Sequence, residues 1–198
     1  GGAGSVLGTQ LVAKSAPDGY TLGMIDTAFA INPSLADKLP YDSERDFSFV
    51  AIVATSPSLL VTHPGLKVRT LQELIAAARQ NPGKLSFGSQ IGGFGHLNAT
   101  SFLAIAGAQA FHVPYKAPGD DLPALLRGDI DFSFVATTLA MPQVMAGKFR
   151  VLAVTGAKRM RALPDAPTLL ELMKNELLVQ ENWTGLSAPA KTPSDVVN

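Results

Sequence analysis

The sequence predicts an α/β fold, in which helices flank a central sheet. Strand-like and helix-like segments alternate along the whole chain, which is typical of α/β sheets wrapped by helices. Of the 198 residues, 46% are apolar and 16% are charged, so there is enough hydrophobic surface for a substantial core. The spacing of the segments fits βαβ crossovers, and we therefore expect mostly parallel sheets.

The first part of the chain contains short predicted elements separated by turns. In order, they are a helix at 1–14, a turn at 17–19, a strand at 20–25, a short helix at 28–38 and an extended segment at 47–62. Pro57 lacks the N–H that a sheet ladder needs, so we expect it to break the extended segment.

The second part contains two capping boxes, a threonine followed by a glutamate at the third position. Thr70 with Glu73 predicts a helix that stops at 81–83, and Thr168 with Glu171 predicts one of about ten residues. The other predicted elements are strands at 84–88, 110–113, 131–135, 150–154 and 183–188, and helices at 96–106, 122–126, 139–146 and from 192.

Charge and composition argue against several classes of protein. Sixteen Lys and Arg balance sixteen Asp and Glu, so no broad positive field exists and we expect no nucleic-acid partner. Cysteine is absent, which excludes disulfides and thiolate metal sites. The longest apolar stretch, 47–61, is too short for a spanning helix. No basic segment followed by an apolar run opens the chain, so we expect no signal peptide within it.

The glycine-rich segment 87–96 is the most informative for function. It joins a predicted strand to a predicted helix, where free N–H groups and the helix dipole favour a carboxylate or phosphate. The expected ligand contacts here are Ser89, Gly92, Gly93, Phe94, Gly95 and His96. The alternative is that the glycines only form a tight turn. The segment matches neither a P-loop, nor a dinucleotide fingerprint, nor a nucleophile elbow.

Histidines and acidic pairs offer little further chemistry. His96 falls in the first turn of a predicted helix, where a positive charge is unfavourable, so we expect a neutral imidazole that orients the turn. His63 and His112 lack partners at metal-ligand spacing, and we expect neither a metal site nor a cofactor. The pairs Asp120/Asp121 and Asp129/Asp131 are expected to be caps and solvated faces.

Two further loops follow predicted strands, where open α/β sheets bind ligands. The expected contacts are Asp26, Thr27 and Ala28 in one loop, and Ala136, Thr137 and Thr138 in the other. Each loop offers hydroxyls and helix-start amides. The alternative is that the threonines are only helix caps.

Motifs throughout the chain resemble the Bug family, the receptors of tripartite tricarboxylate transporters. They are Pro17-Asp18-Gly19-Tyr20-Thr21-Leu22, Ile31-Asn32-Pro33-Ser34-Leu35, Leu39-Pro40-Tyr41-Asp42, Val113-Pro114-Tyr115-Lys116, Gly128-Asp129-Ile130-Asp131, Leu163-Pro164-Asp165-Ala166-Pro167-Thr168 and Trp183-x-Gly185-Leu186-x-Ala188-Pro189. The resemblance implies a type II periplasmic binding-protein fold. Residues 1–58 and 183–198 would form an incomplete first lobe, and 59–182 the second.

The resemblance also implies a function. A monomeric, non-enzymatic periplasmic receptor would capture a small organic carboxylate in a cleft and deliver it to membrane transporter subunits. The three loops named above match the ligand-binding loops of the family. Phe94 stands near a position where the family commonly has a hydroxyl residue, which suggests an apolar part in the ligand.

The family has further elements before the position of Gly1 and after that of Asn198, so we expect exposed apolar surface where they pack. Two alternative functions stay open. One is an enzyme with His96 as base and Ser89 or Thr137 as hydroxyl partner. The other is a sensory or scaffolding module with a vestigial cleft.

Overall fold

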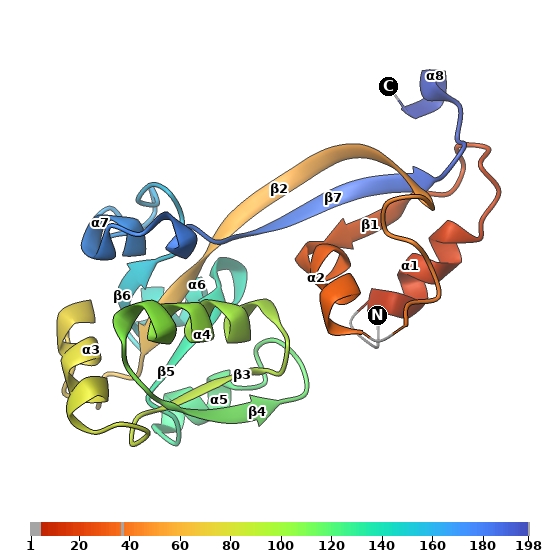
Figure 1. Ribbon diagram of the computed structural model, residues 1–198. Coiled ribbons are helices and arrows are strands. Elements are labelled where there is room, and N and C mark those ends of the chain that lie inside the picture. The colour runs from red at the N-terminus through yellow and green to blue at the C-terminus, as the bar shows by residue number, and fades with distance from the viewer. Residues whose placement is uncertain (1–4, 37, 198) are drawn as a thin grey trace. The chain divides into compact units, whose positions relative to one another are not determined.

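The computed structural model describes residues 5–36 and 38–197, and the chain divides into two compact units (Figure 1). Unit 1 comprises residues 1–55 and 182–198, and unit 2 comprises residues 56–181. The expected helix residues 1–4 and the residues 37 and 198 lie outside the described part. Among the described residues, no helix has both the length and the apolar character needed to cross a bilayer.

Unit 1 is built on strands from both ends of the chain. Its elements are α1 (Val6–Ala13), β1 (Gly23–Asp26), α2 (Thr27–Leu35), the start of β2 (Phe47–Thr62), most of β7 (Glu181–Pro189) and α8 (Ser194–Val197). β1 pairs antiparallel with β7, which in turn neighbours β2. A small core of Ile25, Phe29, Tyr41 and Phe47 forms beneath α2, with Trp183 packed against it.

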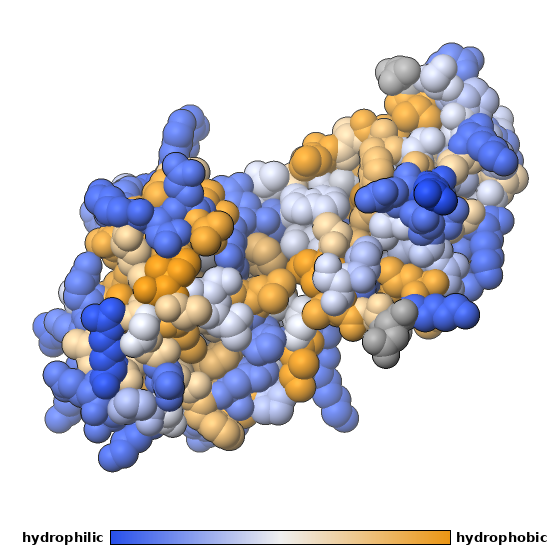
Figure 2. Space-filling model, in the orientation of Figure 1, coloured by the Kyte–Doolittle hydropathy of each residue, from blue (hydrophilic) through white to orange (hydrophobic). Residues whose placement is uncertain are grey.

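Unit 1 carries several exposed apolar side chains. Met24, Phe49, Ile52 and Val53 are each more than half exposed. Orange patches are visible on this unit in the space-filling view (Figure 2).

Unit 2 contains a mixed sheet in the order β6-β2-β5-β3-β4. Its elements are the rest of β2, α3 (Leu71–Gln80), β3 (Ser86–Gln90), α4 (Phe94–Ala106), β4 (Phe111–Tyr115), α5 (Leu122–Arg127), β5 (Phe132–Ala136), α6 (Thr137–Met145), β6 (Arg150–Val154), α7 (Leu169–Met173) and the 3₁₀ turn η2 (Glu176–Leu178). The α/β class is confirmed. β4, β3 and β5 pair in parallel, and β6 runs in the same direction, because β5 and β6 are both antiparallel to the β2 strand between them. β2 therefore runs against the other strands of this sheet, which makes the sheet mixed.

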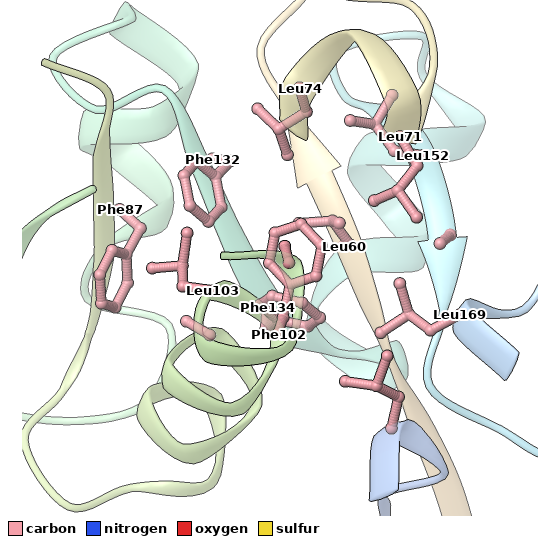
Figure 3. Close-up of a cluster of buried hydrophobic side chains, with 14 of the residues drawn as sticks. Leu60, Leu71, Leu74, Phe87, Phe102, Leu103, Phe132, Phe134, Leu152 and Leu169 are labelled. Atoms are coloured by element: carbon pink, nitrogen blue, oxygen red, sulfur yellow. The ribbon is translucent and has the colours of Figure 1, made fainter. Parts of the chain in front are cut away.

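Helices cover both faces of this sheet, which explains the continuous apolar run in β2. Leu60 belongs to a cluster with α3, α4 and α7, whereas its neighbours Leu59 and Val61 belong to a cluster with α5 and α6. Successive side chains of a strand point to opposite faces, so a strand buried on both faces has no polar alternation. Figure 3 shows the first cluster, in which Phe102 of α4 lies against Phe134 of β5.

The expected break at Pro57 and two predicted element boundaries were wrong. β2 continues through Pro57, and its ladder with β5 begins after that residue, at Ser58. α7 has five residues, not about ten, since Lys174 adopts a left-handed conformation after it. β1 begins at Gly23, after a turn in which the Asp18 carboxylate accepts the Tyr20 N–H.

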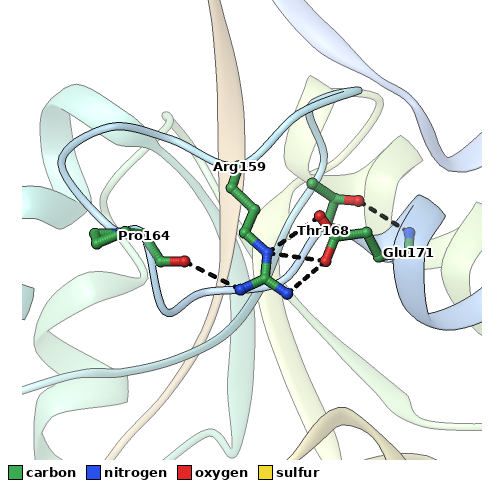
Figure 4. Close-up of polar contacts among 4 residues, drawn as sticks. All are labelled: Arg159, Pro164, Thr168 and Glu171. Atoms are coloured by element: carbon green, nitrogen blue, oxygen red, sulfur yellow. Dashed lines mark hydrogen bonds and ion pairs between the residues drawn. The ribbon is translucent and has the colours of Figure 1, made fainter.

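An ion pair fixes the long loop that precedes α7 (Figure 4). The guanidinium of Arg159 contacts the carboxylate of Glu171 at 2.7 Å and also donates to the Pro164 carbonyl. Thr168 accepts the Glu171 N–H, as its capping box predicted. The hydrogen bonds from Arg159 lower the pKa of the Glu171 carboxyl. The pair is exposed, so its main effect is to orient the loop.

Candidate functional site

Two of the three predicted loops meet at one edge of the unit 2 sheet. β3 and β5 are parallel neighbours, with Phe87 opposite Phe132 and Gly88 opposite Ser133. Their carboxyl ends therefore lie side by side, and α4 and α6 both begin there. We call the start of α4 (residues 93–96) and the start of α6 (residues 137–139) the α4/α6 site.

Gly95 brings the start of α4 against β5. A Cβ atom on Gly95 would lie 2.6 Å from the carbonyl oxygen of Phe134, a distance that real side chains do not tolerate. Gly92 has φ +68, a backbone conformation that glycine adopts readily. The glycines thus do form a tight turn, and the same turn places the first amides of α4 beside β5.

Neither helix start in this site is occupied by a capping side chain. The N-cap of α4 is Gly93 and that of α6 is Ala136, and neither side chain can accept a hydrogen bond. The first N–H groups of a helix have no intrahelical acceptor, and the helix dipole favours negative charge there. The free N–H groups of these two neighbouring helix starts can donate hydrogen bonds to the oxygens of one carboxylate group.

The third predicted loop, at the start of α2 in unit 1, differs in this respect. The Asp26 carboxylate accepts the Ala28 N–H at 2.9 Å and so caps α2 itself. The Thr27 hydroxyl oxygen accepts the Trp183 N–H at 3.3 Å. A capping carboxylate repels an anion, so the Thr27 hydroxyl is the group of this loop best suited to contact a ligand. The roles of Asp26, Thr27 and Ala28 in ligand binding stay predictions.

The hydroxyl groups predicted in unit 2 have different surroundings. Ser89 is only 5% exposed, and its Oγ lies 2.8 Å from Nε2 of His112. Thr137 donates its hydroxyl proton to the Pro57 carbonyl at 2.6 Å. Thr138 is exposed in the first turn of α6, and it is therefore the most accessible of the three.

A pair of stacked histidines supports the glycine-rich turn. Nδ1 of His96 accepts the Gly92 N–H at 3.2 Å, and the His96 and His112 rings lie 4.5 Å apart. Burial, and secondarily the charge of His112, lower the pKa of His96. A neutral His96 that orients the turn agrees with the sequence prediction. His112 was missed, because only the pairing of β3 with β4 brings it to Ser89.

The surroundings of Ser89 differ from those that the enzyme alternative required. Nε2 of His112 lies 2.8 Å from the Ser89 Oγ and 3.2 Å from the Ser89 carbonyl oxygen, and the tautomer with a proton on Nε2 satisfies both contacts. The partner of Ser89 is His112, not His96 as the enzyme hypothesis required. Within residues 5–36 and 38–197, no three His, Asp or Glu side chains are grouped to hold a metal ion.

One predicted solvated carboxylate is in fact buried. Asp121 is 4% exposed, and its Oδ2 lies 2.5 Å from the Ser133 hydroxyl, which also lies 2.9 Å from the Gly88 carbonyl. Burial raises the pKa of the Asp121 carboxyl, although the hydrogen bond from Ser133 opposes this. The sequence prediction was wrong here because β5 brings Ser133 against the residue that precedes α5. The Asp131 carboxylate is only partly buried, and it accepts the Ser86 N–H at 2.7 Å.

Comparison with known proteins identifies the family. The family described as "Tripartite tricarboxylate transporter family receptor" matches residues 1–198. The chain belongs to this family. A relative from Pseudomonas sp. (strain P51), named "UPF0065 protein in tcbD-tcbE intergenic region", is 35% identical over 197 residues, which are 99% of this chain and 59% of the relative. The chain thus spans about three-fifths of the length of this relative.

Several solved structures share the fold of this chain. The periplasmic binding protein BugD has a TM-score of 0.85 and 31% identity, covering 100% of this chain and 66% of BugD. R. palustris Rpa4515 with adipate has a TM-score of 0.86 and 31% identity, and the match covers 97% of this chain and 64% of Rpa4515. MatC from Rhodopseudomonas palustris with bound malate has a TM-score of 0.82 and 27% identity, and the match covers 99% of this chain and 67% of MatC. BugD is a periplasmic binding protein, and the fold that it shares with this chain is the two-lobed periplasmic binding-protein fold.

Proposed function

We propose that this chain is part of a periplasmic receptor that binds a small dicarboxylate and delivers it to membrane subunits of a tripartite transporter. The observation that carries the proposal is the α4/α6 site, where two uncapped helix starts lie at the ends of adjacent parallel strands. Adipate and malate, the acids in two related structures, each carry two carboxylates. The receptor acts as a monomer by binding alone, without covalent chemistry.

The α4/α6 site supplies groups for one carboxylate. The amides of Gly95 and His96 and the hydroxyl of Thr138 lie in the first turns of the two helices. Hydrogen bonds from N–H groups to an ionised oxygen are roughly twice as strong as those between neutral groups. Phe94, which is half-buried at the start of α4, offers an apolar surface to the carbon chain of the acid.

The proposal predicts stabilisation by dicarboxylates. At a concentration about 100-fold above Kd, a ligand that binds only the folded state adds about 2.7 kcal/mol, which corresponds to a rise in Tm of roughly 5–10 °C. Thermal unfolding should be measured with adipate, malate and citrate. The controls are sodium chloride at matched ionic strength and 1,6-hexanediol, a neutral analogue of adipate. If no acid raises Tm more than these controls, the proposal is wrong.

A second prediction concerns Thr138. Thr138→Ala removes one hydroxyl donor from the site, and we expect dicarboxylate affinity to fall by about 0.5–1.5 kcal/mol, or roughly two- to tenfold. The Tm of the free protein should stay nearly constant, because the side chain is exposed. Thr138→Ser keeps the hydroxyl and serves as the matched control. Isothermal titration with the acid that binds most strongly measures the affinity of the parent and of both variants. Equal affinity for all three proteins would exclude a ligand contact by Thr138.

A further inference from the structure

A second pocket lies at the other end of the unit 2 sheet. Within β2, Ser58 pairs with Ala136, whereas Thr62 pairs with Phe132 and Arg150. The loop after Thr62 is therefore about 13 Å further along the strands than the α4/α6 site, at 3.3 Å per residue. It borders a pocket of about 570 Å³ lined by Pro64, Gly65, Leu66, Lys67, Arg69, Glu73 and Arg150. We call this the basic pocket.

The basic pocket has an excess of positive charge. Lys67, Arg69 and Arg150 stand against a single carboxylate, that of Glu73, which leaves two positive charges in excess. The Glu73 carboxylate is engaged by the Arg69 backbone N–H at 2.7 Å. None of the three cationic side chains takes part in the ion pairs found among the described residues. Cations gathered in a concave surface raise the local concentration of anions.

Arg150 is held in place before any ligand arrives. Its Nη1 donates to the carbonyl oxygens of Val68 at 2.8 Å and Leu66 at 3.4 Å, and the side chain is half-buried. A guanidinium has five N–H donors in a rigid plane, so anchoring by Nη1 leaves others for an oxyanion. A fixed donor loses little conformational entropy when it binds. Lys67 and Arg69 are exposed and are free to close over a bound anion.

We propose that the basic pocket binds a small oxyanion with two or more negative charges, at a site separate from the α4/α6 site. The two excess positive charges match a dianion, and the pocket has room for a small molecule. Arg150 makes the fixed contact, while Lys67 and Arg69 add attraction from the rim. Phosphates and dicarboxylates share this chemistry, so the test compares both sources.

The test is an NMR titration of the 198-residue protein with inorganic phosphate, pyrophosphate and succinate at constant ionic strength. We expect amide shifts to change at residues 63–70 and 150. Arg150→Gln should weaken pyrophosphate binding at least tenfold, and Lys67→Gln about threefold. Arg45→Gln is the matched control, because Arg45 is exposed, pairs with Asp42 and belongs to unit 1. It should leave binding unchanged.

Succinate shifts at 63–70 as large as those of pyrophosphate would identify dicarboxylates as ligands of the pocket, whereas shifts with pyrophosphate alone would identify phosphates. Two results would overturn the proposal: chemical-shift changes spread over all exposed Lys and Arg, or equal pyrophosphate affinity in Lys67→Gln and Arg45→Gln. Lys67 is exposed, so its replacement tests the pocket even if Arg150→Gln unfolds the loop. Thr138→Ala should not affect these shifts, which separates failure here from failure of the proposed receptor function.

Discussion

Gly95→Ala is expected to abolish dicarboxylate binding at the α4/α6 site and to destabilise unit 2. The added methyl group would lie 2.6 Å from the Phe134 carbonyl oxygen, so the start of α4 must move away from β5. Overpacking of this kind costs about 1–3 kcal/mol. The same movement separates the α4 amides from those of α6, so two ligand-binding groups are lost together. Thermal unfolding measures the first effect, and isothermal titration with adipate or malate measures the second.

Gly8→Ala provides the control for this substitution. Gly8 lies inside α1, and beyond the backbone of that helix no atom stands within 4 Å of the place that a methyl group would take. Alanine is the better helix former by about 1 kcal/mol, so this variant should be as stable as the parent or more so. A Gly95→Ala protein with the Tm of the parent and unchanged affinity would show that close packing of α4 on β5 does not position the site.

Local sequence signals predicted the helices and strands well wherever the signal acts within a few residues. The capping threonines Thr70 and Thr168 both accept the N–H of the glutamate three positions later, as their spacing indicated. The bounds of β2 and β6 also agree with the predicted ranges. The direction of β2 relative to β5 is a property of the assembled sheet, and no short-range pattern encodes it.

In the candidate site, too, local patterns predicted local structure but not the contacts between distant segments. Glycine spacing predicted a turn at 92–95, and the structure has a turn at 91–93, with α4 already beginning at Phe94. The proximity of that turn to Ala136 followed from the rule that parallel strands end at one edge. The partners of Ser89 and Asp121 were not predictable, because His112 and Ser133 reach them from strands that are distant in sequence. Buried polar pairs of this kind depend on strand pairing and leave no periodic signal.

The buried group formed by Asp121 and Ser133 has a direct consequence for stability. The Ser133 hydroxyl has one proton but lies within hydrogen-bonding distance of two acceptors, the Gly88 carbonyl and the Asp121 carboxylate. When Asp121 is protonated, it can donate to Ser133 while Ser133 donates to Gly88, and both contacts are satisfied. When Asp121 is ionised, Ser133 can donate its proton to only one of the two acceptors. Backbone N–H groups of Asp121 and Gly119 favour the ionised form, whereas burial and the nearby charge of Asp120 oppose it.

Asp121→Asn should therefore raise the stability of the protein at neutral pH. The pKa of Asp121 is raised in the folded state, so its stabilising effect is complete below the unfolded pKa of about 3.9 and is lost as pH rises through the folded value. Asparagine donates to Ser133 at every pH, and we expect a gain of about 1 kcal/mol at pH 7, or roughly 2–4 °C in Tm, with little gain at pH 4.

Ser133→Ala is the informative partner of this variant, because it leaves Gly88 and Asp121 buried without their shared donor and should cost about 1–3 kcal/mol at pH 7. Thermal unfolding of the three proteins between pH 4 and pH 8 measures both effects. The opposite signs of the two substitutions at pH 7 follow only if ionised Asp121 competes with Gly88 for one proton. Destabilisation by Asp121→Asn that is equal at pH 4 and pH 8 would show that the carboxyl is ionised throughout and that Ser133 serves it alone.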